Sequence, residues 1–251
     1  MKHTTRLDNQ QLVDTIKHQY DKQQRSKLPS IVAILPSAGK IYPESSLLRE
    51  GKIEMRYMTA YDEDILTNAS YIREGIVFDK LLESIIISDV DVKEIAPVDK
   101  NGLIIYARIL SYGPDYPVNV KDPKTGNTLT RTVDLKRIGY KPFDLNSDEN
   151  GEFEYRVNDT TTIKYTYTSI LNDDDSVSQI LQKIIRQVND SRKPGDIENF
   201  LRYEFFAHDA KIFRSHYIET MPGLNLDYEF EGENGGTFIA GFPIGADLFW
   251  F

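Results

Sequence analysis

Two histidines near the C-terminus are the residues of this chain with the clearest capacity for chemistry. His208 and His216 lie eight positions apart, close to Asp209 and Glu219. On a continuous helix this spacing puts both imidazoles on roughly one face, as a metal site or a hydrolase would need. A third ligand at helical spacing is missing, and the neighbours indicate a packing face: Phe205, Phe206, Ile212 and Phe213. The pattern therefore favours structural histidines, with a hydrolase as the alternative.

The Gly39-Lys40 pair invites comparison with a phosphate-binding loop. Such a loop needs G-x-x-x-x-G-K-[ST] and a helix that opens directly after it. Here Pro36 stands among the spacer residues and Ile41 follows the lysine. A structural turn is the better interpretation.

Residues 146–151 imitate the start of a calcium-binding loop. Asn146, Asp148, Asn150 and Gly151 match its positions 1, 3, 5 and 6. Position 12 would be Val157 rather than the bidentate glutamate that completes the coordination shell. We predict a solvated turn between strands.

The remaining composition points away from cofactor chemistry. The chain has no cysteine, which removes disulfides, thiol nucleophiles and Cys-ligated metals. No G-x-S-x-G elbow marks a nucleophilic serine. We predict no catalytic residue, no metal and no cofactor.

Charge and hydropathy narrow the classes of partner. The 251 residues carry a formal net charge of -9, which argues against non-specific nucleic-acid binding. No run of 18 apolar residues occurs, so no membrane-spanning helix is predicted. The first thirty residues lack the apolar core of a signal peptide, so a cytosolic location is expected.

The elements that position these residues begin with a polar arm at 1–29, where Leu7, Leu12, Ile16 and Tyr20 give a thin apolar stripe. A first strand is predicted at 30–35. A second is predicted where Ile53, Met55 and Tyr57 alternate with Glu54, Arg56 and Met58. Thr59 and Asp62 have the spacing of a capping box at a helix start.

Helices and hairpins alternate along the rest of the chain. A buried helix is predicted at 76–87, and a second helix from Asp99, as the cap, to Tyr112. Hairpins are predicted at 115–135 and 152–167, and a helix at 173–190 from apolar residues at i, i+3, i+4, i+7. A further helix covers 197–220, with room for an interruption, and a hairpin turning at Asn234-Gly235-Gly236 follows.

The order of several motifs resembles the family of baseplate hub and hub-assembly proteins of T4-like contractile-tailed phages. The motifs are PSAGKIYP, RYMTAYDEDILTN and GIVFDKLLESII, followed by ARILSYGPDYPV, AKIFRSHYIETMPGL and FPIGADLFWF. Together they touch most of residues 30–251. Many relatives carry Cys-pair knuckles in two hairpins, whereas here those positions read VKDPKTGNT and FEGENGGTF. Tight turns can hold the same hairpins, so this departure removes the prediction of a bound metal but keeps the prediction of the fold.

The resemblance implies an α+β fold and a non-enzymatic role. We expect a β-rich N-terminal portion, a central helix plus hairpin, and C-terminal helices closed by a hairpin, divided into 1–29, 30–145 and 146–251. The implied function is a structural or assembly component of the tail baseplate hub. A generic cytosolic binding protein is a further alternative.

The same resemblance implies a late protein of virion assembly that acts through protein–protein contacts. Its partners would be other hub proteins and the tape measure protein, met in the host cytoplasm or in the virion tail. The sequence does not separate a hub subunit from a transient assembly factor.

An interface hypothesis can be written residue by residue. The C-terminal aromatic cluster includes Phe242, Leu248 and Phe249, and it either packs on its own core or inserts into a partner. The expected interface set is Lys40, Tyr42, Arg56, Tyr57, Arg108, Tyr112, Arg214, Trp250 and Phe251.

Overall fold

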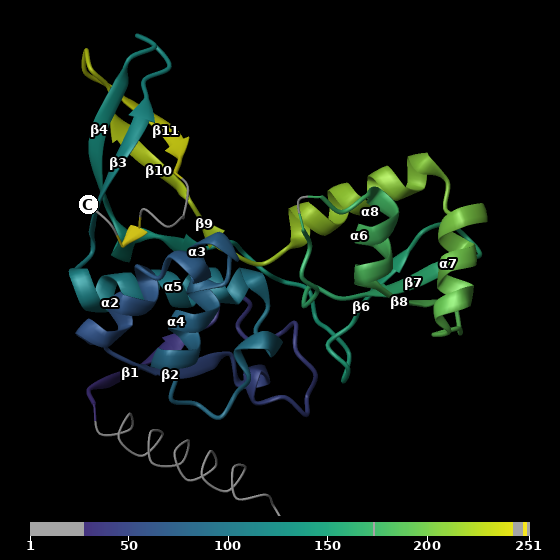
Figure 1. The fold of residues 1–251 in the computed structure, drawn as a ribbon. Helices are drawn as coiled ribbons and strands as arrows, with labels where there is room; N and C mark the ends of the chain where they lie inside the picture. Colours follow the sequence, from purple (N-terminus) through teal and green to yellow (C-terminus); the bar gives the residue numbers. More distant parts are fainter. Residues whose placement is uncertain (1–27, 173, 243–247, 250–251) are drawn as a thin grey trace, which may run out of the picture.

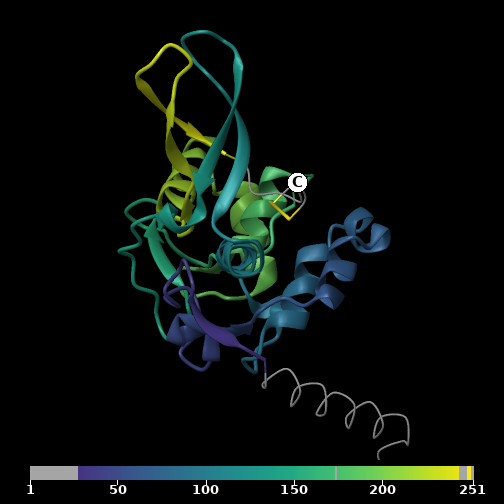
Figure 2. The ribbon, with the colours of Figure 1, turned by 90° about the vertical axis from the view of Figure 1, so that its left-hand side faces the viewer.

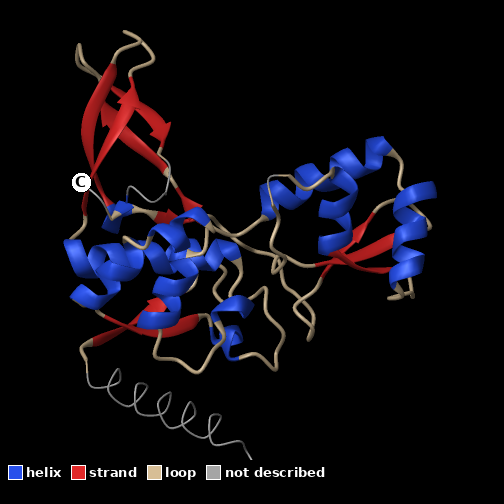
Figure 3. Cartoon of the chain, in the orientation of Figure 1, coloured by secondary structure: helices blue, strands red, loops and turns tan. Residues whose placement is uncertain are grey.

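The computed structural model describes residues 28–172, 174–242 and 248–249. It has α+β architecture, as predicted from the sequence, with helices and small antiparallel sheets in three parts (Figures 1 and 3). We call them the helical body (residues 28–112), the hairpin pair (residues 115–134 and 227–241) and the distal unit (residues 153–220). The predicted N-terminal arm lies almost wholly outside the described residues.

The helical body forms around a two-stranded sheet covered by helices on one face. Strands β1 (Ser30–Ile34) and β2 (Lys52–Arg56) pair antiparallel, with Val32 opposite Glu54. The short helix η1 (Leu47–Glu50) lies between these strands in the chain. The helices that follow β2 are α2 (Ala60–Leu66), α3 (Ala69–Arg73), α4 (Val77–Ile85), η2 (Val92–Glu94) and α5 (Pro97–Tyr112).

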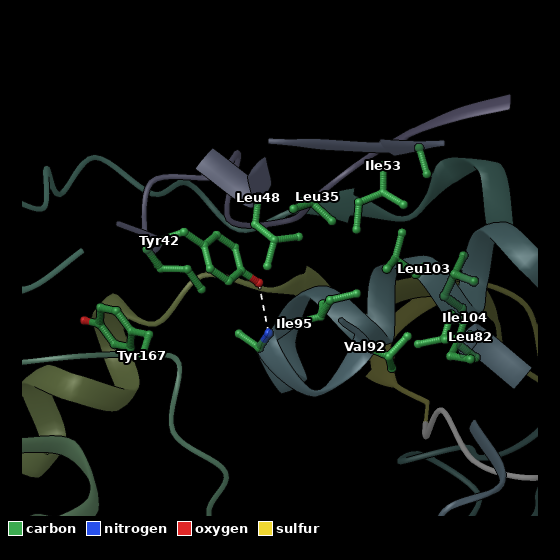
Figure 4. Packing of buried hydrophobic residues seen from close by; sticks show 14 of the residues in the cluster. Leu35, Tyr42, Leu48, Ile53, Leu82, Val92, Ile95, Leu103, Ile104 and Tyr167 are labelled. Carbon is green, nitrogen blue, oxygen red and sulfur yellow. Dashed lines mark hydrogen bonds between the residues drawn. The ribbon is translucent and has the colours of Figure 1, made fainter. Parts of the chain in front are cut away.

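The core of the helical body joins the sheet to α4 and α5. Ala33, Leu35 and Ile53 are fully buried on the inner face of the sheet. Figure 4 shows Leu35, Leu48 and Ile53 lying across from Ile95 and Leu103. Burying a side chain of this size contributes about 1.5–3 kcal/mol, so this contact is a main stabilising term of the body.

Two predictions about the helical body need correction. Tyr57 was expected on the second strand, but β2 ends at Arg56 and Tyr57 is exposed. Asp99 was expected to cap α5, but Ala96 is the N-cap and Pro97 takes the first helical position. Proline suits that position because its φ is already helical and it has no N–H to leave unpaired. Asp99 therefore lies inside the first turn and is buried.

The hairpin pair projects from the end of α5. β3 (Asp115–Lys121) pairs with β4 (Thr128–Asp134), and β10 (Asp227–Glu231) pairs with β11 (Thr237–Gly241). η3 (Leu135–Arg137) and β5 (Gly139–Tyr140) follow β4, and β5 pairs with β9 (Leu224–Asn225). Both views show the two hairpins side by side (Figures 1 and 2).

Hydrogen bonds join the two hairpins near their turns. The Glu233 N–H donates to Asp122, and the Arg131 Nε donates to the Glu231 carbonyl at 2.9 Å. The last hairpin therefore lies against β3 and β4, whereas the expected division at 145/146 grouped it with the C-terminal helices. Sequence separation of about a hundred residues hides this contact from local patterns.

The distal unit is a three-stranded sheet with helices. β6 (Phe153–Arg156) pairs with β7 (Thr162–Tyr165), and β7 pairs with β8 (Ile185–Val188). Its helices are α6 (Val177–Ile184), α7 (Pro194–Tyr203) and α8 (Ala207–Thr220).

The single helix predicted at 173–190 is wrong at both ends. Ser176 caps α6, and the helix gives way at Ile185 to strand β8. Val188 pairs with Ile163 on β7, so sheet pairing overrides a continuous apolar helical pattern. The interruption allowed in the next helix falls between α7 and α8.

Candidate interaction sites

A buried carboxylate ties the PSAGKIYP turn to the start of α5. The Ser37 N–H and hydroxyl donate to Asp99 at 2.8 and 2.7 Å, and the Tyr42 hydroxyl donates at 2.6 Å. The Tyr42 oxygen in turn accepts from the Ala96 N–H, the dashed line in Figure 4. Burial raises the pKa of Asp99 despite these donors, and burial followed by the charge of Asp99 raises the pKa of Tyr42. The arrangement is a scaffold that fixes the turn.

The turn also explains the Gly-Lys pair. Gly39 has φ +78°, and a Cβ there would lie 2.4 Å from the Arg49 carbonyl oxygen. The Lys40 ammonium donates to the Phe143 carbonyl at 2.9 Å and lies 5.9 Å from the centre of that ring. The lysine thus binds its own chain, which supports a structural turn over a phosphate site.

A second buried network joins β2, α2 and α4. The Arg56 guanidinium forms two bonds to Asp62, at 2.7 and 3.0 Å, and a third to the Ser84 hydroxyl. Asp62 also accepts from the Thr59 N–H at 2.7 Å, so the predicted capping box is present. Burial alone would raise the pKa of Asp62, but the hydrogen bonds from Arg56, Ser84 and Thr59 outweigh it and lower that pKa.

Arg108 holds the end of α5 and the C-terminal segment together. Its Nε donates to the Leu248 carbonyl at 2.7 Å, and its terminal nitrogens donate to the Gly113 and Asp115 carbonyls. Phe249 packs beside Tyr112 and Phe78, with ring centres 6.1 Å apart in each case. Of the two interpretations of the C-terminal aromatics, packing on the chain's own core is the one that holds for Phe242, Leu248 and Phe249.

Tyr112 connects this region to α2. Its hydroxyl donates to Glu63 at 2.7 Å, and the guanidinium of Arg108 lies 5.5 Å from its ring centre. Burial, with the Glu63 contact, raises the pKa of Tyr112 to about 12. A phenol with this pKa stays protonated at neutral pH and acts as a hydrogen-bond donor.

The distal unit holds an aromatic cluster around His216. Its Nε2 lies 3.1 Å from the Tyr165 hydroxyl, and the Tyr167 hydroxyl lies 2.6 Å from the Thr220 hydroxyl. Burial lowers the pKa of His216. His208, in contrast, is exposed in the first turn of α8. The two histidines therefore have different surroundings, and no convergent group of metal-ligating side chains occurs among the described residues.

The calcium-like segment is a turn as expected. Asp148 accepts from the Asn150 and Glu152 N–H groups and from the Lys164 ammonium at 2.7 Å. Burial opposes ionisation of Asp148, but Lys164 and the two N–H donors lower its pKa. The Asp148 carboxylate is thus engaged in bonds within its own chain.

The expected interface residues fall into four groups. Tyr42, Arg56 and Arg108 are buried and stabilise the fold, so their side chains are not displayed on the surface of this chain. Lys40, Tyr112 and Arg214 are half-buried, Tyr57 is exposed, and Trp250 and Phe251 lie outside the described residues.

Sequence reasoning missed several large apolar side chains that the fold leaves in solvent. Tyr203 at the end of α7 is 68% exposed and Phe206 at the start of α8 is 69% exposed. Phe206 and Ile212 were assigned to a packing face, and both are exposed. Local periodicity could not reveal this, because the α7–α8 corner decides which side of each helix meets the core.

The fold and these sites define an α+β protein whose polar groups are largely engaged in holding its own chain together. In the part of the chain that the structure describes, no helix is long and apolar enough to cross a membrane. The chain belongs to the T4 bacteriophage base plate protein family, whose model matches residues 28–237. No curated protein and no solved structure matches it. It is therefore a T4-like phage baseplate protein, a structural component that interacts with other tail proteins in the virion tail.

Proposed function

We propose that the protein is a non-enzymatic component of the baseplate hub. It acts as a hub subunit or as a factor that promotes hub assembly, through contacts with other hub proteins and with the tape measure protein. Family membership carries this proposal, since it assigns the chain to the baseplate. It acts in the host cytoplasm during assembly and, as a hub subunit, also in the finished tail.

The chemistry of the described surface supports an interaction role. Asp99, Asp62 and Arg108 are buried charged groups whose hydrogen bonds all lie within the chain. Tyr203 and Phe206, in contrast, present apolar area to solvent at the outer end of the distal unit. Aromatic side chains of this kind are favoured anchors at protein interfaces.

The experiment that tests the proposal is quantitative mass spectrometry of purified phage particles beside the infected-cell lysate. A few copies per tail identify a hub subunit. Absence from particles, with recovery in hub intermediates, identifies an assembly factor. Absence from both contradicts the proposal.

Variants at the surface separate an interface from the fold. Tyr203→Ser combined with Phe206→Ser is expected to reduce recovery in hub intermediates while thermal stability changes little. The matched control is Tyr61→Ser, which removes a tyrosine that is 81% exposed on α2. Equal recovery for both variants would remove the α7–α8 corner from the interface. The other proposed interface positions are Lys40, Tyr57, Tyr112, Arg214, Trp250 and Phe251.

A further inference from the structure

Strand β1 has one edge that pairs with nothing in the described chain. The Leu35 N–H donates to the Gly51 carbonyl and the Tyr57 N–H donates to the Pro29 carbonyl, which fixes the phase of the β1–β2 ladder. In that phase the backbone groups of Ser30 and Val32 point away from β2. Among the described residues, β2 is the only strand hydrogen-bonded to β1.

The devices that usually protect such an edge are missing from β1. Ser30–Ile34 contains no charge, no proline and no bulge, and Val32 and Ile34 are 57% and 46% exposed. Unprotected edges with β-branched side chains accept further strands. The Tyr140 hydroxyl donates to the Ile34 carbonyl at 2.9 Å, so the free length of the edge centres on Ser30 and Val32.

An apolar groove lies next to this edge. It measures about 290 Å³, and Ile31 of β1 forms part of its wall. The other walls come from α5, η3, β5 and β9, and include Ile105, Ile109, Leu135, Ile138 and Leu224. The β1–β2 sheet thus leaves part of α5 uncovered at the place where a third strand would lie.

We propose that the edge of β1 and this groove together bind an extended segment of another baseplate protein as a third strand. The unpaired N–H and C=O groups of Ser30 and Val32 bond its backbone, and every second side chain enters the groove. The segment therefore alternates apolar residues on its inner face. The proposal deepens the proposed hub function and rests on it.

A second copy of this chain fits the site poorly. In a second copy, Ala33 and Leu35 on the inner face of β1 are already fully buried in their own core. On the inner face of that strand only Ile31 stays partly exposed, so it could not offer the alternating set of apolar side chains that the groove would take. The chain's own residues 1–27 also lack the required pattern, because Leu7, Leu12, Ile16 and Tyr20 recur at helical rather than alternating spacing.

The charge at the groove adds to the description of the occupant. Lys136 lines the groove and Arg137 follows it, and both are exposed on a chain whose net charge is -9. An acidic residue flanking the apolar positions would complement this local positive charge. The occupant is thus an alternating apolar segment with an acidic flank.

Photo-crosslinking in infected cells tests the site with the full-length chain. The probe is p-benzoylphenylalanine incorporated at Ile34, and mass spectrometry maps the residues it captures. Val32→Pro removes the outward N–H without taking a hydrogen bond from the β1–β2 ladder. Val32→Thr keeps that N–H and the branched shape, and serves as the matched control.

The proposal expects capture of one segment with alternating apolar residues, in one other baseplate protein. Val32→Pro should lower the yield at least tenfold, and Val32→Thr should leave it within about twofold. Lys136→Glu, at an exposed position, should lower the crosslinking yield severalfold. This second variant tests the site even if Val32→Pro fails to fold. The proposal is overturned if neither Val32→Pro nor Lys136→Glu changes the crosslinking yield. It is also overturned by capture of a second copy, by capture of a segment without alternating apolar residues, or by no capture from assembling hubs.

The same samples separate this proposal from the hub function. If the chain is recovered in hub intermediates or particles but the crosslinks fail as above, the strand site is wrong and the function stands. If the unmodified chain is recovered in neither, the hub function itself fails.

Discussion

The Arg56–Asp62 pair offers the sharpest test of how this fold is held together. Both side chains are almost fully buried, at 6% and 1% side-chain exposure, and the pair joins β2 to the capping box of α2. The perturbation is a double-mutant cycle built from Arg56→Met, Asp62→Ala and the double variant. Methionine retains much of the apolar stem of arginine and removes the charge.

The magnitude follows from the bonds that each variant breaks. Arg56→Met removes two charge-assisted bonds to Asp62, but three other donor atoms remain on that carboxylate, so we expect a loss of about 3 kcal/mol. Asp62→Ala also removes the capping box and leaves a buried guanidinium, so we expect about 4 kcal/mol. The double variant leaves no buried charge unpaired and should lose about 4.5 kcal/mol. The expected coupling is therefore about 2.5 kcal/mol.

The coupling must also depend on pH in one direction. The folded-state pKa of Asp62 lies below its unfolded value of about 3.9, so the carboxylate is stabilised in its charged form. Such a group contributes its full stability above its unfolded pKa and loses it as pH falls through the folded pKa. The coupling should be constant from pH 7 to about pH 5 and should shrink below about pH 4.

The assay is urea denaturation followed by far-UV circular dichroism at each pH. Arg202 and Glu198 on α7 provide the matched control, since they form an exposed i,i+4 pair with 61% and 51% side-chain exposure. Their coupling should be about 0.3–0.5 kcal/mol and should fall with salt, whereas the buried pair should respond little to salt. A coupling at Arg56–Asp62 no larger than that of the control pair would refute the reasoning.

Two further predictions concern the PSAGKIYP turn. Gly39→Ala should destabilise the protein by more than about 3 kcal/mol in the same urea assay, because its Cβ would meet backbone atoms of Arg49 and Gly51. The control, Gly235→Ala, has a similar φ of +82° but lies in open space, so it should cost about 1 kcal/mol. Equal losses would mean that strain rather than close approach decides the effect. Tyr42→Phe should lower the free energy of unfolding by about 1–3 kcal/mol in thermal or urea melts, because it leaves the Ala96 N–H and one oxygen of Asp99 with one partner fewer. The control, Tyr61→Phe at an exposed position, should change stability by less than about 0.5 kcal/mol. A change as small as that for Tyr42→Phe would contradict the network.

Local sequence patterns located most of the elements because their signals are local. The capping box at Thr59 and Asp62 and the turn at Asn234-Gly235-Gly236 depend on residues only a few positions apart. The burial of Phe242, Leu248 and Phe249 followed from their apolar character, as one of two stated alternatives. Patterns of this kind also carried the family resemblance, which the family match confirms at the level of a T4-like baseplate protein.

Patterns failed where distant segments compete for the same residues. Ile185–Val188 continues an apolar helical stripe, yet pairing with β7 makes it a strand. Asp99 has the chemistry of a helix cap, yet Pro97 takes the first helical position and Asp99 binds Ser37 and Tyr42 instead. Arg108 was expected on a surface, but its guanidinium donates to three carbonyl groups, those of Gly113 and Asp115 after α5 and that of the distant Leu248.

The sequence by itself therefore determined the α+β class, the family and most turns, because propensity, capping and hydropathy act over a few residues. Only the tertiary structure decided which charged and aromatic side chains are buried inside the fold and which are exposed to solvent. Exposure depends on what lies across a helix or beside a strand, and that neighbour is often a hundred residues away. The edge of β1 is the plainest case: its sequence is that of an ordinary strand, and it becomes a candidate binding site only because no second strand pairs with it among the described residues.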